Sequence, residues 1–188
     1  MKTLVVYSSL TGNTKKVAEG LFSVLGEGAA EAAACVDVKD KPDPSGYDLI
    51  VPGFWVDKGQ ADAATLSFFE KTAHKKVAFF FTLGAYPDSE HADNVAADAA
   101  KRLTDNGNVV LGHFRCQGKV DPALLERMKK MLPPDHPHAQ MTPERQARLD
   151  EAAKHPDAAD LDKARAFMAD ILAKASQGKA LDPGCSAS

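Results

Sequence analysis

The sequence predicts an open α/β domain in which helices cover both faces of a parallel sheet. Five short apolar runs, each typical of a buried strand, alternate with segments whose apolar residues recur at helical spacing. This alternation is typical of parallel strands joined by right-handed helical crossovers. Ligands of such sheets bind beyond the carboxyl ends of the strands, so a site is expected in the loops that follow the strands.

The individual elements follow from local patterns, of which the first strand and helix are the clearest. Residues 4–7 are an apolar run, and from Asn13 onward the apolar residues fall on one face of a helix that ends near Gly26. Residues 77–82 form the strongest strand, because they include three consecutive phenylalanines. The other elements expected before residue 121 are strands at 34–38, 48–51 and 109–111, and helices at 63–73 and from Ser89 to Asn106.

Past Asp121 the alternation stops, and only helical segments are expected. Residues 124–131 have the apolar spacing of a short helix, and Thr142-Pro143 places a capping residue before a proline at the first helical position. A last helix carries an apolar stripe that includes Ile171. We expect one domain over residues 1–188, with a core at 1–121, a helical extension at 122–177 and a loose tail at 178–188.

Composition restricts the classes of function. The chain has 188 residues, of which 44% are hydrophobic, enough for a packed core. The net charge of −3 is spread along the chain, which gives no basic face for nucleic acid. Three cysteines without a CxxC pair favour a reducing compartment, and no apolar stretch approaches the length that crosses a bilayer. We expect a cytoplasmic protein that neither inserts into membranes nor binds nucleic acid.

A hydroxyl-rich loop joins the first strand to the first helix. Residues 9–14, Ser-Leu-Thr-Gly-Asn-Thr, offer four side chains that can cap a helix, although one cap is enough. The alternative is an anion site, because free backbone N–H groups at a helix N-terminus bind phosphate and nearby hydroxyls add donors. The loop matches neither the nucleoside-triphosphate loop nor the three-glycine dinucleotide fingerprint. We favour a phosphate cradle over an over-capped helix.

Aromatic residues follow two strands at the same predicted edge. Trp55, the only tryptophan of the chain, lies after the third strand in the segment GFWVDKG, and Tyr86 follows the fourth strand. A tryptophan here can simply cover the surface, but exposure of a large aromatic ring is costly and the position is one where a ligand is expected. A phosphate cradle beside aromatic side chains predicts a site for a flat, phosphorylated ring system, for which FMN is the obvious candidate.

These features resemble the flavodoxin family over roughly the first two-thirds of the chain. Residues 9–14 match its phosphate loop, Thr/Ser-x-Thr-Gly-x-Thr, and the resemblance implies a doubly wound, five-stranded flavodoxin-like sheet of order 2-1-3-4-5 with extra C-terminal helices. It further implies that Trp55 covers one face of the FMN ring, that residues 82–84 line its pyrimidine end and that Tyr86 stacks on the other face. The expected FMN-binding residues are Ser9, Leu10, Thr11, Gly12, Asn13, Thr14, Phe54, Trp55, Val56, Thr82, Leu83, Gly84 and Tyr86.

No catalytic residue and no metal ligand are expected. The segment after the fifth strand departs from the family pattern: Cys116 is either a redox thiol or, as we prefer, a buried spectator. Arg115 and Lys119 either attract a nucleotide or an acidic partner, or belong to a solvated loop. His136 and His138 lack further ligands at metal-site spacing.

The resemblance implies two functions of different class. The first is an electron carrier that takes electrons from a reductase to an acceptor enzyme. The long form of this chain resembles a set of bacterial flavodoxin-like proteins, some thought to supply a tetrapyrrole (bilirubin) reductase. The second is an FMN-dependent NAD(P)H:quinone-type oxidoreductase. A binding domain without FMN is a third reading, against which the intact hydroxyl loop argues. The carrier is preferred, because the sequence shows neither a convincing general acid or base nor a nucleotide fingerprint.

Overall fold

The computed structural model describes residues 1–26, 33–131, 133 and 140–177. Its centre is a parallel five-stranded sheet of order β2-β1-β3-β5-β6, with the two-residue strand β4 paired antiparallel to the end of β3. The predicted order of the parallel strands is thereby confirmed. The strands are β1 (Thr3–Tyr7), β2 (Ala33–Asp37), β3 (Leu49–Asp57), β4 (Gln60–Ala61), β5 (Lys76–Leu83) and β6 (Val109–Gln117).

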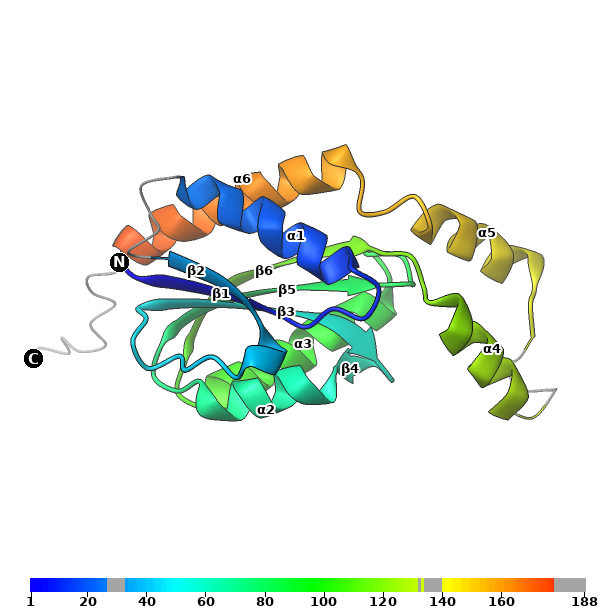
Figure 1. Ribbon diagram of the computed structural model, residues 1–188, viewed down its shortest axis with the longest axis horizontal. Helices are drawn as coiled ribbons and strands as arrows, with labels where there is room; N and C mark the ends of the chain where they lie inside the picture. The colour runs from blue at the N-terminus through cyan, green and yellow to red at the C-terminus, as the bar shows by residue number, and fades with distance from the viewer. Residues whose placement is uncertain (27–32, 132, 134–139, 178–188) are drawn as a thin grey trace, which may run out of the picture.

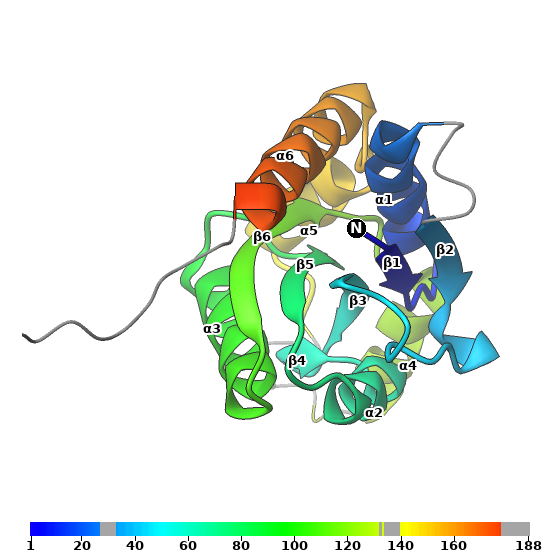
Figure 2. The same cartoon turned by 90° about the vertical axis from the view of Figure 1, so that its left-hand side faces the viewer.

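Helices cover both faces of the sheet, as Figure 2 shows. On one face, α1 and α6 enclose a core in which β1, β3 and β5 meet the buried stripe of α6. On the other face, α2 and α3 enclose a second core that is rich in phenylalanine. The elements are α1 (Asn13–Phe22), the 3-10 turns η1 (Ser23–Leu25) and η3 (Val38–Asp40), and the helices α2 (Ala63–Lys71), α3 (Glu90–Asp105) and α6 (Ala158–Gln177).

Two short helices extend beyond the carboxyl ends of the strands (Figure 1). They are α4 (Pro122–Met131) and α5 (Pro143–Ala152), and we call them the arm. The start signal of α5 is confirmed, because the Thr142 side chain accepts a hydrogen bond from the Arg145 N–H and a proline occupies the first turn. Of the described helices, α4 and α5 contribute no residue to the two core clusters, whereas α6 belongs to the core. The predicted loose tail and the His136–His138 pair lie outside the described residues.

The third and fifth parallel strands are longer than predicted, and this places the candidate site on strand ends. β3 continues through Pro52-Gly53 to Asp57, so Trp55 lies in a strand rather than a loop. At Gly53 a Cβ atom would lie 1.9 Å from the Phe80 ring, so only glycine allows β3 to pass under that ring. β3 then turns through Lys58 and Gly59, both at positive φ, into β4. No helix within the described residues is long and apolar enough to cross a membrane.

Candidate functional site

A cavity of about 90 Å³ lies at the carboxyl edge of the sheet. Four segments form its walls: the loop after β1, the end of β3, the end of β5 and the segment after β6. This is the edge at which parallel sheets of this class bind ligands. The lining residues are Leu10, Thr11, Asn13, Trp55, Val56, Thr82, Leu83, Gly84, Gly118, Lys119, Val120, Asp121 and Leu124.

The N-terminus of α1 points its free backbone N–H groups toward this edge. Its N-cap residue is Gly12, at φ 88°, and no side chain caps the helix. The first intrahelical acceptor is the Gly12 carbonyl, which binds the Lys16 N–H, so the N–H groups of the first helical turn have no acceptor among the residues that the structure describes. The over-capping interpretation is therefore wrong, and the helix end has the donors and the dipole that suit an anion.

The hydroxyl groups of the loop divide into two sets. Ser9 Oγ accepts a hydrogen bond from the Gly12 N–H, and Thr14 Oγ1 lies 2.9 Å from Thr82 Oγ1 in a buried pair, so these two groups tie the loop together and to β5. Thr11 is exposed and lines the cavity. Of this loop, Thr11 is thus the side-chain hydroxyl best placed to meet a ligand.

The Asn13 side chain links the loop to the far wall of the cavity. Its Nδ2 donates to Thr11 Oγ1 at 2.8 Å and to the Lys119 carbonyl at 2.9 Å. The Thr11 hydroxyl also faces the Lys119 carbonyl, at the longer distance of 3.4 Å. The phosphate loop and the segment after β6 are therefore in direct contact, a contact that the sequence did not reveal.

Eight of the thirteen predicted site residues line the cavity. Ser9, Gly12 and Thr14 belong to the same loop without lining it, and Phe54 and Tyr86 lie elsewhere. Trp55 is half-buried at the end of β3, pairs with Thr82 in the sheet and lines the cavity with Val56. Phe54 points into the core instead, where its ring stacks on Phe81 at a centroid distance of 5.2 Å. Tyr86 is 44% exposed and does not line the cavity.

Two groups of residues at this edge were not among the expected FMN-binding residues. The segment Gly118–Asp121, together with Leu124 of α4, forms one wall; its place after the fifth parallel strand indicated that it reaches this edge, but not that it lines the cavity. Beneath the phosphate loop, the buried Asp62 caps α2 and accepts hydrogen bonds from the hydroxyls of Ser8 and Thr65. This network fixes the end of β1 relative to α2.

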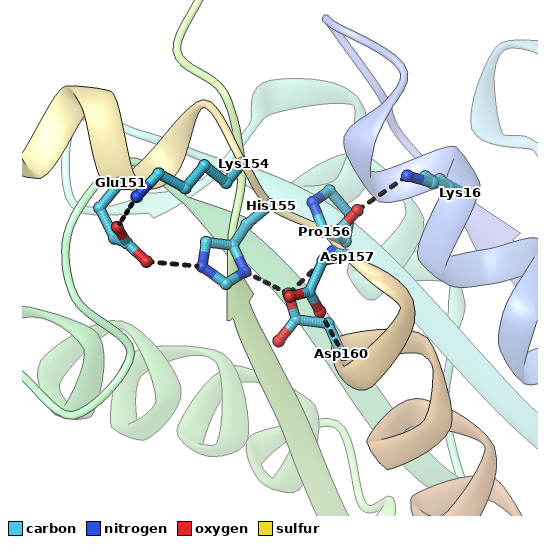
Figure 3. A network of polar contacts seen from close by, with 7 residues as sticks. All are labelled: Lys16, Glu151, Lys154, His155, Pro156, Asp157 and Asp160. Atoms are coloured by element: carbon cyan, nitrogen blue, oxygen red, sulfur yellow. Dashed lines mark hydrogen bonds and ion pairs between the residues drawn. The ribbon is translucent and has the colours of Figure 1, made fainter.

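A polar network at the junction of α5 and α6 lies next to the same wall (Figure 3). The His155 ring bridges Asp160 of α6 and Glu151 of α5, with nitrogen–oxygen distances of 2.5 Å and 3.3 Å. The hydrogen bond to Asp160 raises the pKa of His155. The backbone carbonyl of His155 accepts the Lys119 N–H, so the junction touches the cavity wall directly.

His155, Asp157 and Asp160 also bring three potential metal ligands within 4.8 Å of one another. The carboxylates of Asp157 and Asp160 already accept backbone hydrogen bonds at the start of α6. Asp157 Oδ1 accepts the Asp160 N–H, and Asp160 Oδ2 accepts the Asp157 N–H. This reciprocal pairing is that of a helix capping box. We therefore assign the cluster to helix capping.

Cys116 and Arg115, at the end of β6, have structural environments. Cys116 is 2% exposed in the core, and burial raises the pKa of its thiol, so it lacks the thiolate character of a redox group. Arg115 forms an ion pair with Asp93 of α3 at 2.6 Å. By contrast, the Lys119 side chain is exposed at the cavity and has no partner among the described residues.

Comparison with known proteins agrees with this geometry. A family model described as the flavodoxin domain matches residues 4–169, so the chain belongs to the flavodoxin domain family. The chain is 33% identical over 185 residues to the flavodoxin-like domain-containing protein BilS of Clostridioides difficile (strain CD3), which covers 94% of this chain and 99% of that protein. It is 32% identical over 199 residues to BilS of Clostridium symbiosum (strain WAL-14163), which covers 95% and 100%.

Solved structures share the fold at lower sequence identity. A flavodoxin from the domain Archaea superposes with a TM-score of 0.60 at 16% identity, covering 94% of this chain and 99% of that one. Oxidised flavodoxin 1 from Bacillus cereus superposes with a TM-score of 0.58 at 18% identity, covering 92% and 98%. These likenesses establish the fold that the sheet order shows.

Proposed function

We propose that this protein binds FMN and carries electrons between a reductase and an acceptor enzyme. The observation that carries the proposal is the uncapped N-terminus of α1, which opens with Thr11 onto the same cavity as Trp55 and Gly84. Free N–H groups and a hydroxyl suit a phosphate, and an aromatic side chain beside them suits a ring. The residues present therefore fit FMN, which supplies the redox chemistry when bound.

A carrier fits the site better than an enzyme. The titratable side chains that line the cavity are Lys119 and Asp121, both from the segment after β6. Neither lies in a buried pair of the kind that tunes a general acid or base. The pocket thus offers chemistry for holding a cofactor and little for a second substrate. An FMN-dependent NAD(P)H:quinone-type oxidoreductase is the alternative function.

For the acceptor we propose a tetrapyrrole reductase of the bilirubin-reducing class. Two features support it: the resemblance of the long form to bacterial flavodoxin-like proteins thought to serve such enzymes, and the near full-length match to two proteins named BilS. We also propose a cytoplasmic location, since Cys35 and Cys116 are free thiols. The redox partners are expected to be proteins, as membership of the flavodoxin domain family suggests. The small net charge gives no basic face for nucleic acid.

The test of FMN binding compares ligands with and without a phosphate. FMN should bind much more tightly than riboflavin, and Thr11→Ala should weaken FMN binding by about 1.5–3 kcal/mol, the usual loss for a hydrogen bond to a charged group. Riboflavin affinity should hardly change. Thr104→Ala, which removes an exposed hydroxyl bonded within α3, is the matched control. Equal affinity of the wild-type protein for the two flavins would falsify the phosphate cradle.

A separate measurement distinguishes carrier from enzyme. The purified, FMN-loaded protein should show no sustained turnover of NADPH with a quinone until a reductase is added. Sustained turnover by the protein alone would replace the carrier with the oxidoreductase.

A further inference from the structure

The cavity at the carboxyl edge offers a ligand one free charge, and that charge is positive. Of the two titratable side chains that line it, Asp121 already serves the start of α4, because its Oδ1 accepts the Ala123 N–H at 2.9 Å. The Lys119 ammonium lines the same cavity and has no ion pair or hydrogen bond to any residue that the structure describes. The ligand that this charge favours is an anion.

The backbone of Lys119 is fixed against the phosphate loop. Its N–H donates to the His155 carbonyl at 3.3 Å, and its carbonyl accepts the Asn13 Nδ2 at 2.9 Å. The Thr11 hydroxyl faces the same carbonyl at 3.4 Å. The side chain of Lys119 therefore starts from a defined point beside the loop. Its flexible four-carbon stem lets the ammonium approach an anion held at the N-terminus of α1.

The neighbouring cations differ from Lys119 in both respects. Lys15 and Lys16, in the first turn of α1, do not line the cavity. Lys15 Nζ lies 3.9 Å from a Glu19 carboxylate oxygen, and Lys16 Nζ donates to the Pro156 carbonyl at 2.8 Å. No arginine lines the cavity. Among the described cations, the combination of a place on the cavity and a free ammonium is therefore found at Lys119.

We propose that Lys119 is an anion-binding residue of this site, whose ammonium pairs with the phosphate of the bound cofactor from the wall opposite the phosphate loop. This inference rests on the proposed FMN site. The loop offers neutral donors, namely backbone N–H groups and the Thr11 hydroxyl, whereas a phosphate monoester carries a charge of about −1.5 to −2 at pH 7. Lys119 adds a full positive charge, so the site selects a phosphorylated ligand by charge as well as by hydrogen bonds.

Charge removal at residue 119, combined with salt, tests the pairing. An exposed ion pair changes an equilibrium by about 2- to 5-fold, so Lys119→Gln should weaken FMN binding by that factor at an ionic strength of about 0.01 M, where charges act over about 30 Å. At about 1 M salt, where they act over about 3 Å, the difference should vanish. Lys119→Arg, which keeps the charge, should retain the FMN affinity, and riboflavin should bind to all three proteins alike.

Lys15→Gln is the matched control, because it removes the same charge from an exposed residue beside the same loop but outside the cavity. It should weaken FMN binding less than Lys119→Gln does. Equal losses in the two variants would mean that only the general field acts, and would overturn the pairing. An equal loss of riboflavin affinity in Lys119→Gln would place the ammonium away from the phosphate and overturn it as well.

The wild-type protein separates this inference from the proposed function. Wild-type protein that binds FMN, together with unchanged FMN affinity of Lys119→Gln at low salt, would refute the role of Lys119 and leave the FMN site standing. Wild-type protein that binds neither flavin would refute both. If Lys119 instead meets an acidic partner protein, Lys119→Gln should leave FMN affinity unchanged and slow electron transfer to the acceptor, which also contradicts the pairing.

Discussion

Residues of the loop at 9–14 that carry the same functional group have different roles. Thr14 and Thr11 carry the same hydroxyl, yet Thr14 is buried against Thr82 and Thr11 faces the cavity. Burial decides between them, because a hydroxyl that already has a buried partner loses that bond when it serves a ligand. Substitution of Thr14 should therefore act through the structure of the loop, and substitution of Thr11 through the ligand.

Trp55 provides a built-in reporter of the site. It is the only tryptophan of the chain, it lines the cavity, and its ring stacks on no other aromatic ring in the described parts of the chain. If the flavin ring binds beside it, Trp55 emission should be strongly quenched in the loaded protein and recover when FMN is removed. Trp55→Ala should weaken FMN binding by roughly 1–3 kcal/mol, as for aromatic stacking on nucleobases.

Trp55→Phe is the matched control for that measurement, since it keeps an aromatic face and removes the indole. It should retain most of the affinity that Trp55→Ala loses. Tryptophan emission that does not respond to FMN would place the flavin away from the end of β3.

Among the secondary-structure elements, the junction of α5 and α6 carries a pH dependence of defined sign. The pKa of His155 is raised, chiefly by its hydrogen bond to Asp160 and further by Glu151. A raised pKa in the folded state means that the protonated form contributes stability below the ordinary histidine pKa of about 6.5. That contribution is lost as the pH rises through the higher folded-state pKa.

We therefore expect the free energy of unfolding to fall relative to His155→Gln as the pH rises from about 6 to 8. Denaturant unfolding of both proteins at several pH values measures the difference. Asp160→Asn should remove most of the pH dependence and Glu151→Gln less of it, in the order of their effects on His155. A wild-type-to-variant difference that stays constant with pH would contradict the assignment. Substitution of Lys154, which forms an ion pair with Glu151, should leave the order of these two effects unchanged.

The elements also show where sequence patterns suffice and where they fail. Apolar runs predicted the central strands β1, β3 and β5, because these strands are mostly buried and leave a continuous apolar signature, whereas the strand order was implied by the resemblance to flavodoxins. The end of β3 escaped prediction, since Pro52-Gly53 suggests a break. Its continuation depends on the Phe80 ring from another strand filling the space above Gly53, a contact that no local pattern shows.

In the candidate site, too, residues that belong to a local motif were predicted, whereas a contact between distant segments was not. The phosphate loop is a local motif between a strand and a helix, so its residues were predicted together. The contact of this loop with the segment Gly118–Asp121 was not predicted, because the hydrogen bond from Asn13 to the Lys119 carbonyl joins residues 106 positions apart. Phe54 was expected in the site together with Trp55 and Val56, but its side chain lies in the core, since successive residues of a strand face opposite ways.

In the molecule as a whole, α6 packs in the core, whereas the two helices of the arm extend beyond the sheet. Ala164, Met168, Ile171 and Ala175 of α6 are buried against α1 and the sheet. By contrast, Met131 at the end of α4 is 76% exposed, and Met141, just before α5, is 53% exposed. The arm extends beyond the carboxyl edge of the sheet (Figure 1), and its residue Leu124 lines the cavity. A redox partner of the proposed FMN site would approach at this edge. We therefore propose the arm as part of the partner surface.

The stability of the whole fold should depend on α6. Ile171→Ala removes a fully buried side chain and should cost about 2–5 kcal/mol in the free energy of unfolding, whereas the exposed Lys163→Ala on the same helix should cost within about 0.5 kcal/mol. Domains of this size have about 5–15 kcal/mol in total. A chain that ends at Asp121 loses the four buried apolar side chains of α6 and should aggregate, as sedimentation after expression would show. A soluble, FMN-loaded chain of that length would mean that the face covered by α6 needs no cover.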